Sequence, residues 1–244
     1  MAASPLTRHN ILYEDDHLII IHKPSGILSH PNHPGKGPIT AFEGTYNPGE
    51  RCFQTPVGPL WLLHRLDQEA SGILLAAKTK EATAACRGAF ERKEVEKDYL
   101  VLVSRRPIPP KGKWMDFLSE KKLSGGIKVS VARGPKPNAI LHYVQKEYFP
   151  KFNLALLEIR LITGKTHQIR VQSVYHGHPV AGDRVYGNFA FNKELRDALG
   201  LRRLFLHAWR LVIKHPVKNS ILEIEAPLPE ELEQCLLKAS SPKR

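Results

Sequence analysis

The amino-acid sequence predicts an α+β fold in which a mixed, mostly antiparallel central sheet is flanked by helices and loops. Three observations support this prediction. Strand-like runs outnumber helix-like runs, the two kinds alternate irregularly, and no repeat period appears in the 244 residues. A chain of this length with 42% hydrophobic residues can bury a substantial core.

The chain opens with short strands. Residues 11–14 and 17–23 are strand-like runs joined across two aspartates, and a Pro-Ser-Gly sequence ends the second run, which indicates a hairpin. Residues 27–59 then contain too many prolines and glycines for a long element. We expect a long loop there, and loops of that length in compact domains are usually functional or mobile.

The middle of the chain combines buried strands with one helix. The apolar runs 61–63 and 73–77 have the length and the boundaries of buried strands. A segment rich in Ala, Glu, Lys and Arg predicts a helix over 80–94 with Thr79 as its N-cap. After a strand over 97–104, the basic segment 107–137 predicts exposed short strands and turns, which fit a nucleic-acid-facing edge or a solvated loop.

The last third of the sequence alternates strands with short helices. A turn at Gly164-Lys165 precedes a short helix over 167–176, for which Thr166 is the expected cap and Gly177 the expected end. The other predicted elements are strands at 139–146 and 152–163, a helix at 192–199, a hairpin of 204–214 with 220–225, and a C-terminal helix at 230–238.

The charge balance indicates a polyanionic partner. Thirty-six Lys and Arg against 24 Asp and Glu give a net charge of +12 and a pI near 9.7, which favours nucleic acid. Three scattered cysteines without a C-x-x-C pair indicate reduced thiols. The sequence shows no signal-peptide core and no run long enough for a membrane span, so we expect a cytoplasmic protein.

A carboxylate lies between the two buried runs at 61–63 and 73–77. A buried Asp is unfavourable unless it is paired or hydrogen-bonded, so Asp67 needs a cationic neighbour. Arg65 precedes it by two residues, which on a strand would place both side chains on one face. The pair is therefore either a structural ion pair or part of a catalytic site.

Three other chemistries fit the residues poorly. Gly164-Lys165-Thr166 lacks the glycine that a phosphate-binding P-loop needs five positions earlier, where Ile159 stands. The histidines of 30–33 and 176–178 lack the spacing and the third ligand of a metal site. Asp67 and Glu69 are two residues apart on one segment, whereas the two carboxylates of a glycosidase flank the sugar from both sides.

Six blocks along the chain resemble the RluA family of pseudouridine synthases. The segment L-H-R-L-D-Q-E-A-S-G resembles the family's H-R-L-D-x-x-T-S-G signature, and I-I-I-H-K-P-S-G resembles its first block, N-K-P-x-G. The remaining blocks follow in family order up to about residue 227: E-K-D-Y-L, L-I-T-G-K-T-H-Q-I-R-V-Q, G-H-P-V-A-G-D-R-V-Y-G and L-F-L-H-A-W-R-L-V-I-K-H-P. The resemblance thus covers nearly the whole chain.

The resemblance implies a set of site residues. Asp67 would be the nucleophile, Tyr99 would stack on the target base, and Arg170 would pair with Asp67. Arg65 would fill the place of the flipped nucleotide. We also expect His64, Lys165 and His167 at the RNA. The departures from the family pattern, His22, Ala70, Lys165 and Gln172, leave the three catalytic positions unchanged.

The same resemblance implies the fold and the reaction. We expect a pseudouridine synthase catalytic domain over 10–240 after an N-terminal tail over 1–9, without the S4 RNA-binding domain that is frequent in the family. The expected enzyme is a monomer that isomerises uridines in ribosomal or transfer RNA without metal or organic cofactor. A non-catalytic RNA-binding factor of ribosome assembly and a nucleoside glycosidase are the alternatives. The sequence leaves open which chemical route Asp67 takes, and whether 27–59 or 107–137 selects the substrate.

Overall fold

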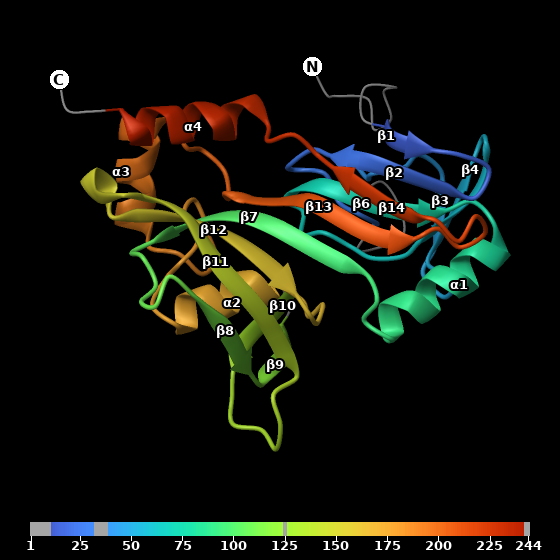
Figure 1. Ribbon diagram of the computed structural model, residues 1–244, viewed down its shortest axis with the longest axis horizontal. Helices are drawn as coiled ribbons and strands as arrows, with labels where there is room; N and C mark the ends of the chain where they lie inside the picture. The colour runs from blue at the N-terminus through green and yellow to red at the C-terminus, as the bar shows by residue number, and fades with distance from the viewer. Residues whose placement is uncertain (1–10, 32–38, 124–125, 242–244) are drawn as a thin grey trace. The chain divides into compact units, whose positions relative to one another are not determined.

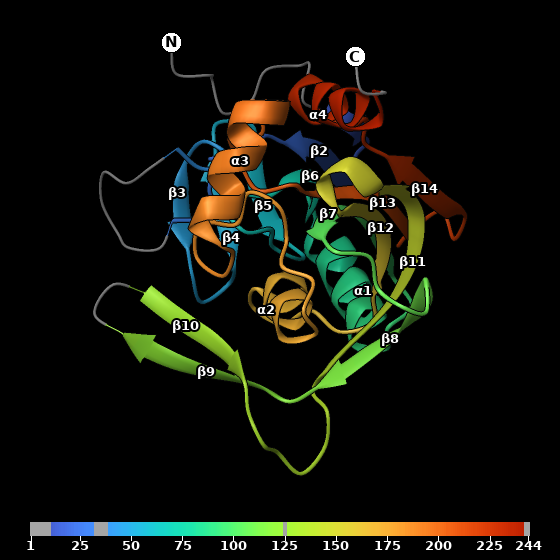
Figure 2. The same ribbon diagram turned by 90° about the vertical axis from the view of Figure 1, so that its left-hand side faces the viewer.

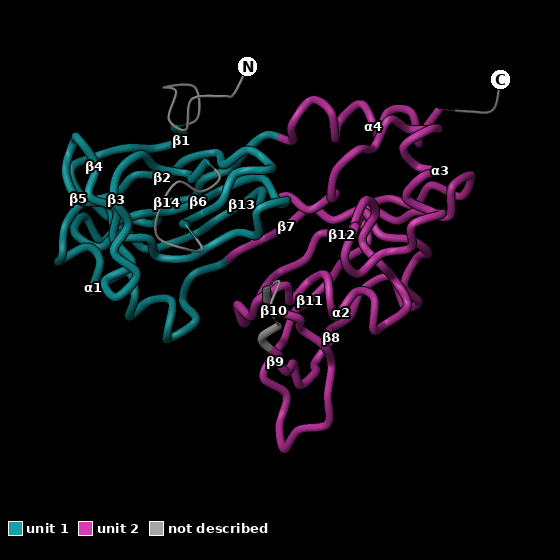
Figure 3. The backbone as a smooth tube through the Cα atoms, turned by 180° about the vertical axis from the view of Figure 1, so that it is seen from behind, with its two compact units in different colours: residues 1–96, 208–227 teal, residues 97–207, 228–244 magenta. Residues whose placement is uncertain are grey.

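The computed structural model describes residues 11–31, 39–123 and 126–241, and it divides the chain into two compact units. Unit 1 contains residues 1–96 and 208–227, and unit 2 contains residues 97–207 and 228–244 (Figure 3). The predicted tail over 1–9 lies outside the described residues. The single catalytic domain over 10–240 stays a prediction.

The described residues of unit 1 form a mostly antiparallel sheet and one helix (Figure 1). Its strands follow the order β3-β4-β5-β6-β13, with β2 also paired to β6, β1 to β2 and β14 to β13. The elements are β1 (Ile11–Glu14), β2 (Leu18–Lys23), β3 (Thr45–Asn47), β4 (Cys52–Thr55), β5 (Gly58–Leu62), β6 (Ser71–Ala77), α1 (Lys80–Glu91), β13 (Leu206–Lys214, which begins in unit 2) and β14 (Ile221–Glu225).

The paired strands β2 and β6 of unit 1 have buried side chains on both faces. Along β6, Ile73 and Leu75 belong to one apolar cluster, while Leu74 and Ala76 belong to another. Because successive side chains of a strand point to opposite faces, a continuous apolar run is what a strand between two cores requires. Helix α1 covers one of these cores with Ala82, Cys86 and Ala89.

Gly72 at the start of β6 allows a close backbone approach. Its φ of +116° lies in the region that favours glycine, and a Cβ at this position would overlap the backbone of Ala208 on β13. The glycine of the L-D-Q-E-A-S-G segment is therefore required by packing between two strands.

Unit 2 contains a second antiparallel group of strands in the order β7-β12-β11-β8 and a separate pair, β9 and β10. Figure 2 shows this pair as a two-stranded ribbon, and α2 contacts β10. The elements are β7 (Glu96–Ser104), β8 (Lys111–Asp116), β9 (Leu118–Leu123), β10 (Gly126–Val131), β11 (Ala139–Phe149), a 3₁₀ turn η2 (Pro150–Phe152), β12 (Leu154–Leu161), α2 (Gln168–Tyr175), α3 (Phe189–Leu199) and α4 (Glu230–Ser240).

The α+β class with a mostly antiparallel sheet is confirmed, and most predicted elements form close to their expected bounds. One difference lies in 27–59, of which 32–38 fall outside the described residues. Strands β3 and β4 form a hairpin in this segment, because short strands between Pro and Gly gain their pairing partners from the tertiary structure. The prediction of a single long loop was wrong.

None of the helices in the part of the chain that the structure describes is long and apolar enough to cross a membrane.

Candidate active site

Asp67 lies in a connection between β5 and β6, residues 63–70, which we call the Asp67 loop. The loop has no strand conformation, so the prediction that Arg65 and Asp67 share one strand face was wrong. Its backbone bonds instead to a neighbouring segment: the Leu66 N–H donates to Ser29 Oγ at 2.9 Å, and the Ser29 hydroxyl donates to the Leu66 carbonyl at 2.8 Å. Both polar backbone groups of the residue before Asp67 are thereby fixed.

The part of the loop that follows Asp67 is held by the Lys-Pro-Ser-Gly sequence, which begins with the last residue of β2. Lys23 is fully buried, and its Nζ donates to the carbonyls of Pro24, Ile27 and Gln68 at 2.9, 2.7 and 3.3 Å. The Gly26 N–H donates to the Gln68 carbonyl at 2.8 Å. A buried ammonium that donates to several carbonyls fixes the segment 23–29 and the Asp67 loop against each other.

The side chains of the Asp67 loop differ in exposure. Arg65 is exposed, Asp67 is half-buried and Leu66 is buried. His64 is half-buried; its Nε2 accepts from the Leu75 N–H at 3.1 Å and its ring stacks on Phe90 with centroids 5.7 Å apart. These contacts give His64 a part in holding the loop, and its role at the RNA stays a prediction.

In unit 2, Arg170 lies in the first turn of α2, as predicted, and is 3% exposed. Its Nε and Nη2 donate to the two carboxylate oxygens of Asp183 at 2.7 and 2.8 Å. Burial alone would raise the pKa of Asp183, but the hydrogen bonds and charge of Arg170, with the N–H groups of Tyr186 and Val185, lower this pKa below its ordinary value. The pair is thus ionised and rigid.

Asp183 is a residue that the sequence reasoning missed. The signal was present, because the quoted segment G-H-P-V-A-G-D-R-V-Y-G contains both Asp183 and Tyr186. The Arg170 Cζ lies 5.2 Å from the centroid of the Tyr186 ring, and the Tyr186 hydroxyl lies 2.8 Å from Nδ1 of His167. This loop after α2 therefore determines where the guanidinium of Arg170 lies.

The turn before α2 is held differently from the prediction. His167, with a φ of +53°, is the N-cap residue, and Thr166 is not the cap. The Gln168 side chain accepts hydrogen bonds from the Lys165 N–H at 3.0 Å and the Thr163 hydroxyl at 2.9 Å, which closes the turn. Lys165 is exposed and His167 is half-buried, and their contact with RNA stays a prediction.

Tyr99 lies on β7, 6% exposed and paired in register with Ile159. Lys97 shares its sheet face, since the two are two residues apart on one strand. Lys97 Nζ lies near the turn at Gly164, and burial lowers the pKa of this lysine. Lys97 is a second residue that the sequence reasoning did not name, although it stands in the quoted E-K-D-Y-L block.

The structure thus gathers His64, Arg65 and Asp67 in one loop of unit 1, and Lys165, His167 and Arg170 at one helix end of unit 2. The pairing of Asp67 with Arg170 joins residues of different units and stays a prediction. Among the described residues, no three His, Cys, Asp or Glu side chains are grouped as a metal site. His176 instead lies 3.0 Å from an Asp116 oxygen and stacks on Trp114.

Comparison with known proteins agrees with this arrangement. Residues 17–174 match the family described as RNA pseudouridylate synthase, and the chain belongs to this family. It is an RNA-modifying isomerase whose substrate is RNA.

Among curated proteins, it is 37% identical to "Ribosomal large subunit pseudouridine synthase C" of Escherichia coli strain K12, over 93% of this chain and 69% of the relative. The protein of the same name from Haemophilus ducreyi is also 37% identical, over 96% and 70%. The solved structure titled "Human RNA Pseudouridylate Synthase Domain Containing 4" superimposes with a TM-score of 0.70 at 23% identity, over 95% of this chain and 93% of that one, and shows the same fold.

Proposed function

We propose that Asp67 is the nucleophile with which this chain converts uridine to pseudouridine in RNA of the large ribosomal subunit. The observation that carries the proposal is the construction of the Asp67 loop. Ser29 and Lys23 hold its backbone on both sides, while the Asp67 side chain stays half-buried. A carboxylate in this setting is fixed in place and still accessible to a substrate.

The reaction needs little more than such a carboxylate and a place for the base. The N1–C1′ bond breaks, the freed uracil turns, and C5 bonds to C1′. The hydrogen on C5 leaves as a proton and N1 gains a proton, so the product is an isomer of the substrate. No oxidant, reductant or second substrate is consumed. An ionised carboxylate is the nucleophilic form, and a nearby guanidinium such as that of Arg170 favours it.

The target uridine must leave its stack to reach a half-buried carboxylate, because the base of a helical nucleotide is inaccessible. An aromatic face such as that of Tyr99 can then hold the flipped base, and Arg65 is exposed and able to enter the vacated place. The excess of Lys and Arg supplies phosphate contacts and hence most of the affinity. A substrate in the ribosome would place the enzyme in the cytoplasm.

The nucleophile is tested by Asp67→Asn, with Glu69→Gln as a matched loss of one carboxylate from the same loop. The substrate is a transcript of Escherichia coli large-subunit RNA labelled with tritium at C5 of uridine. We expect wild type and Glu69→Gln to release tritium and Asp67→Asn to release none while still binding the transcript. Turnover by Asp67→Asn would overturn the nucleophile, and loss of turnover in Glu69→Gln alone would point to the other acid.

The substrate is tested separately, by carbodiimide-dependent primer extension of ribosomal and transfer RNA from cells with and without the gene. A missing stop in large-subunit RNA supports the proposal. A missing stop in transfer RNA alone would overturn the choice of RNA and leave the enzyme class intact. Absence of any change, together with RNA binding by the wild type, would favour the non-catalytic assembly factor.

A further inference from the structure

A basic aromatic surface in unit 1 is built by residues of the β3–β4 hairpin, by His30, by Arg65 of the Asp67 loop and by residues of α1. We call it the hairpin shelf, and it consists of His30, Tyr46, Arg51, Arg65, Lys80 and Arg87. We propose that the hairpin shelf binds the RNA strand next to the target uridine, stacking a base on the His30–Tyr46 pair and holding phosphates on its cations. The inference rests on the proposed function, because it assumes that uridine in RNA reaches Asp67.

The aromatic part of the shelf is a preformed stack. The rings of His30 and Tyr46 are nearly parallel, with centroids 5.1 Å apart and an interplanar angle of 9°, and both residues are half-buried. Phe53 supports Tyr46 from within the core at 4.8 Å between centroids. Any nucleobase can extend such a stack, whichever of the four bases it is, since every base has a π-face.

Arginines act electrostatically on this stack. Burial lowers the pKa of His30, the hydrogen bond with the Pro31 carbonyl opposes this, and the charges of Arg65 and Arg51 lower the pKa again, so that it lies below its ordinary value. Burial raises the pKa of Tyr46, while Arg51, Arg65 and Arg87 act on it in the opposite sense. Arg51 and Arg65 thus act electrostatically on both rings, and Arg65 belongs to the Asp67 loop.

The tip of the hairpin is held in a fixed shape. The Asn47 side chain accepts from the N–H groups of Gly49 and Glu50 at 3.0 and 3.3 Å, and the Arg51 carbonyl accepts from the Leu62 N–H at 2.8 Å. Arg51 is exposed with a φ of +54°, a strained conformation for a residue with a side chain. Strained residues concentrate at binding sites, where the surrounding structure maintains them.

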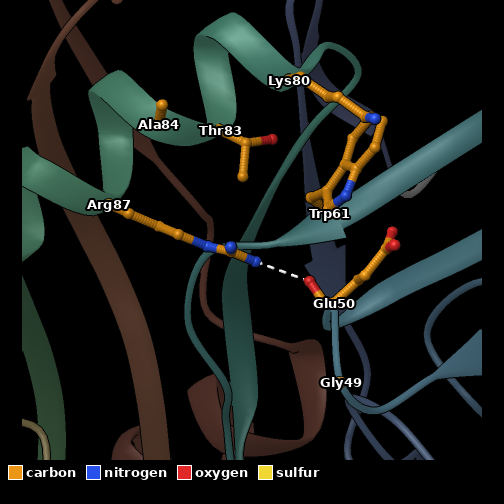
Figure 4. A pocket seen from close by; sticks show the side chains of 7 residues that line it. All are labelled: Gly49, Glu50, Trp61, Lys80, Thr83, Ala84 and Arg87. Atoms are coloured by element: carbon orange, nitrogen blue, oxygen red, sulfur yellow. Dashed lines mark hydrogen bonds between the residues drawn. The ribbon is translucent and has the colours of Figure 1, made fainter.

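The shelf continues into a pocket of about 350 Å³ between the hairpin tip and α1 (Figure 4). Arg87 reaches from α1 to the Glu50 carbonyl at 2.7 Å, so the two sides of the pocket are connected. The pocket is lined by Gly49, Glu50, Trp61, Lys80, Thr83, Ala84 and Arg87. Lys80 and Arg87 on α1 add two cations at this pocket, which Glu50 also lines, and such cations can hold the phosphates of a bound strand.

The test separates binding from chemistry. Arg51→Asn removes the charge and keeps a residue that tolerates a positive φ, and the double variant Arg51→Asn with Lys80→Gln removes a second charge. Lys238→Gln, an exposed lysine of α4 outside the shelf, is the charge-matched control. Tyr46→Leu removes the stacking face, and Tyr46→Phe retains it.

Turnover is measured on the tritium-labelled large-subunit transcript. We expect KM to rise about tenfold for Arg51→Asn and for Tyr46→Leu, with kcat unchanged. Tyr46→Phe and Lys238→Gln should behave like the wild type. Normal KM in the double variant, or a loss confined to kcat, would overturn the shelf as a binding surface.

Binding is measured in the Asp67→Asn protein, with the same transcript at several salt concentrations. Each lost phosphate contact should reduce the slope of log K against log salt by about 0.7 to 0.9. An unchanged slope in the double variant would overturn the proposal even if the enzyme is active. If the wild type releases no tritium, the proposed function fails, and this arm still decides whether the shelf holds RNA.

Discussion

The Asp67 loop of unit 1 and the Arg170 helix end of unit 2 fix their key side chains in different ways. In the loop, Ser29 and Lys23 bond to the backbone and leave the Asp67 carboxylate half-buried. At the helix end, Arg170 is itself buried and is held through its charge by Asp183. The role that we propose for Asp67 requires contact with the substrate, whereas a buried cation such as Arg170 is tolerated because its charge is matched.

The largest effect should come from breaking the buried pair. Asp183→Asn removes the carboxylate that accepts two hydrogen bonds from the buried Arg170 guanidinium, so we expect the free energy of unfolding to fall by about 3–5 kcal/mol. Urea denaturation measures it. The control is Asp197→Asn, whose pair with Arg196 is exposed on both sides and should contribute at most about 0.5 kcal/mol. Equal losses in both variants would show that burial does not distinguish them.

Ser29→Ala tests how strongly the backbone bonds of Ser29 hold the Asp67 loop. The variant removes the hydroxyl that bonds both backbone groups of Leu66, so we expect a loss of about 1–3 kcal/mol in unfolding free energy. Converted to free energy, the fall in the kcat of tritium release should exceed this loss of stability, since the loop that carries Asp67 is loosened. Ser25→Ala is the control, because its hydroxyl bonds only the Glu69 carbonyl at the edge of the loop. A normal kcat in Ser29→Ala would remove its positioning role.

Acid should weaken unit 2 through Asp183. The pKa of Asp183 is lower in the folded chain than its ordinary value of 3.8, so its contribution is complete above that value and is lost as pH falls through the folded pKa. We expect unfolding free energy to decline below about pH 4 in the wild type and to decline less steeply in Asp183→Asn. The measurement is urea denaturation from pH 6 to pH 2.

The pKa of a second carboxylate, that of Asp15 in unit 1, is also lowered in the folded chain. Burial alone would raise the pKa of Asp15, but hydrogen bonds from Lys218, from the N–H groups of His17 and Leu18, and from Tyr13 lower it. Asp15→Asn therefore repeats the acid test if Asp183→Asn does not fold. Parallel curves for the wild type and both variants would contradict the linkage.

The smallest effect concerns the N-terminus of α2. Thr166→Ala should change unfolding free energy by less than about 0.5 kcal/mol, because Thr166 is not the cap. Asn188→Ala should cost about 1 kcal/mol, because Asn188 caps α3 through the Phe191 N–H. Thermal denaturation of the pair compares them, and a larger loss for Thr166→Ala would reverse the assignment.

These two regions also show how far a sequence can be interpreted. Strand-like apolar runs predicted β2 and β6, and helix-forming composition predicted α1, whose expected cap Thr79 accepts from the Ala82 N–H at 3.1 Å. These features depend on neighbours a few residues away. The strands on either side of Asp67 were predicted, but the conformation between them was not, because it depends on Ser29, 37 residues before Leu66. Local patterns do not contain such contacts.

The site itself could be predicted as residue types and not as partners. The motif resemblance named Asp67, Tyr99 and Arg170. The pairing of Asp67 with Arg170, which belong to different units, remains a prediction. Asp183 was missed as the partner of Arg170 because the two are 13 residues apart and meet only when the loop after α2 folds back. The helix start at α2 was misassigned because a side chain inside the helix, Gln168, closes the turn that a preceding Thr usually caps.

Gly72 has a consequence for related sequences. Since a Cβ there would overlap the Ala208 backbone, the glycine that closes the signature is required for the two strands to approach each other. A homologue without the acid five positions earlier would still need this glycine to fold. The glycine in another chain is therefore evidence of shared architecture, and the acid, which we propose as the nucleophile, is the residue that bears on enzymatic activity.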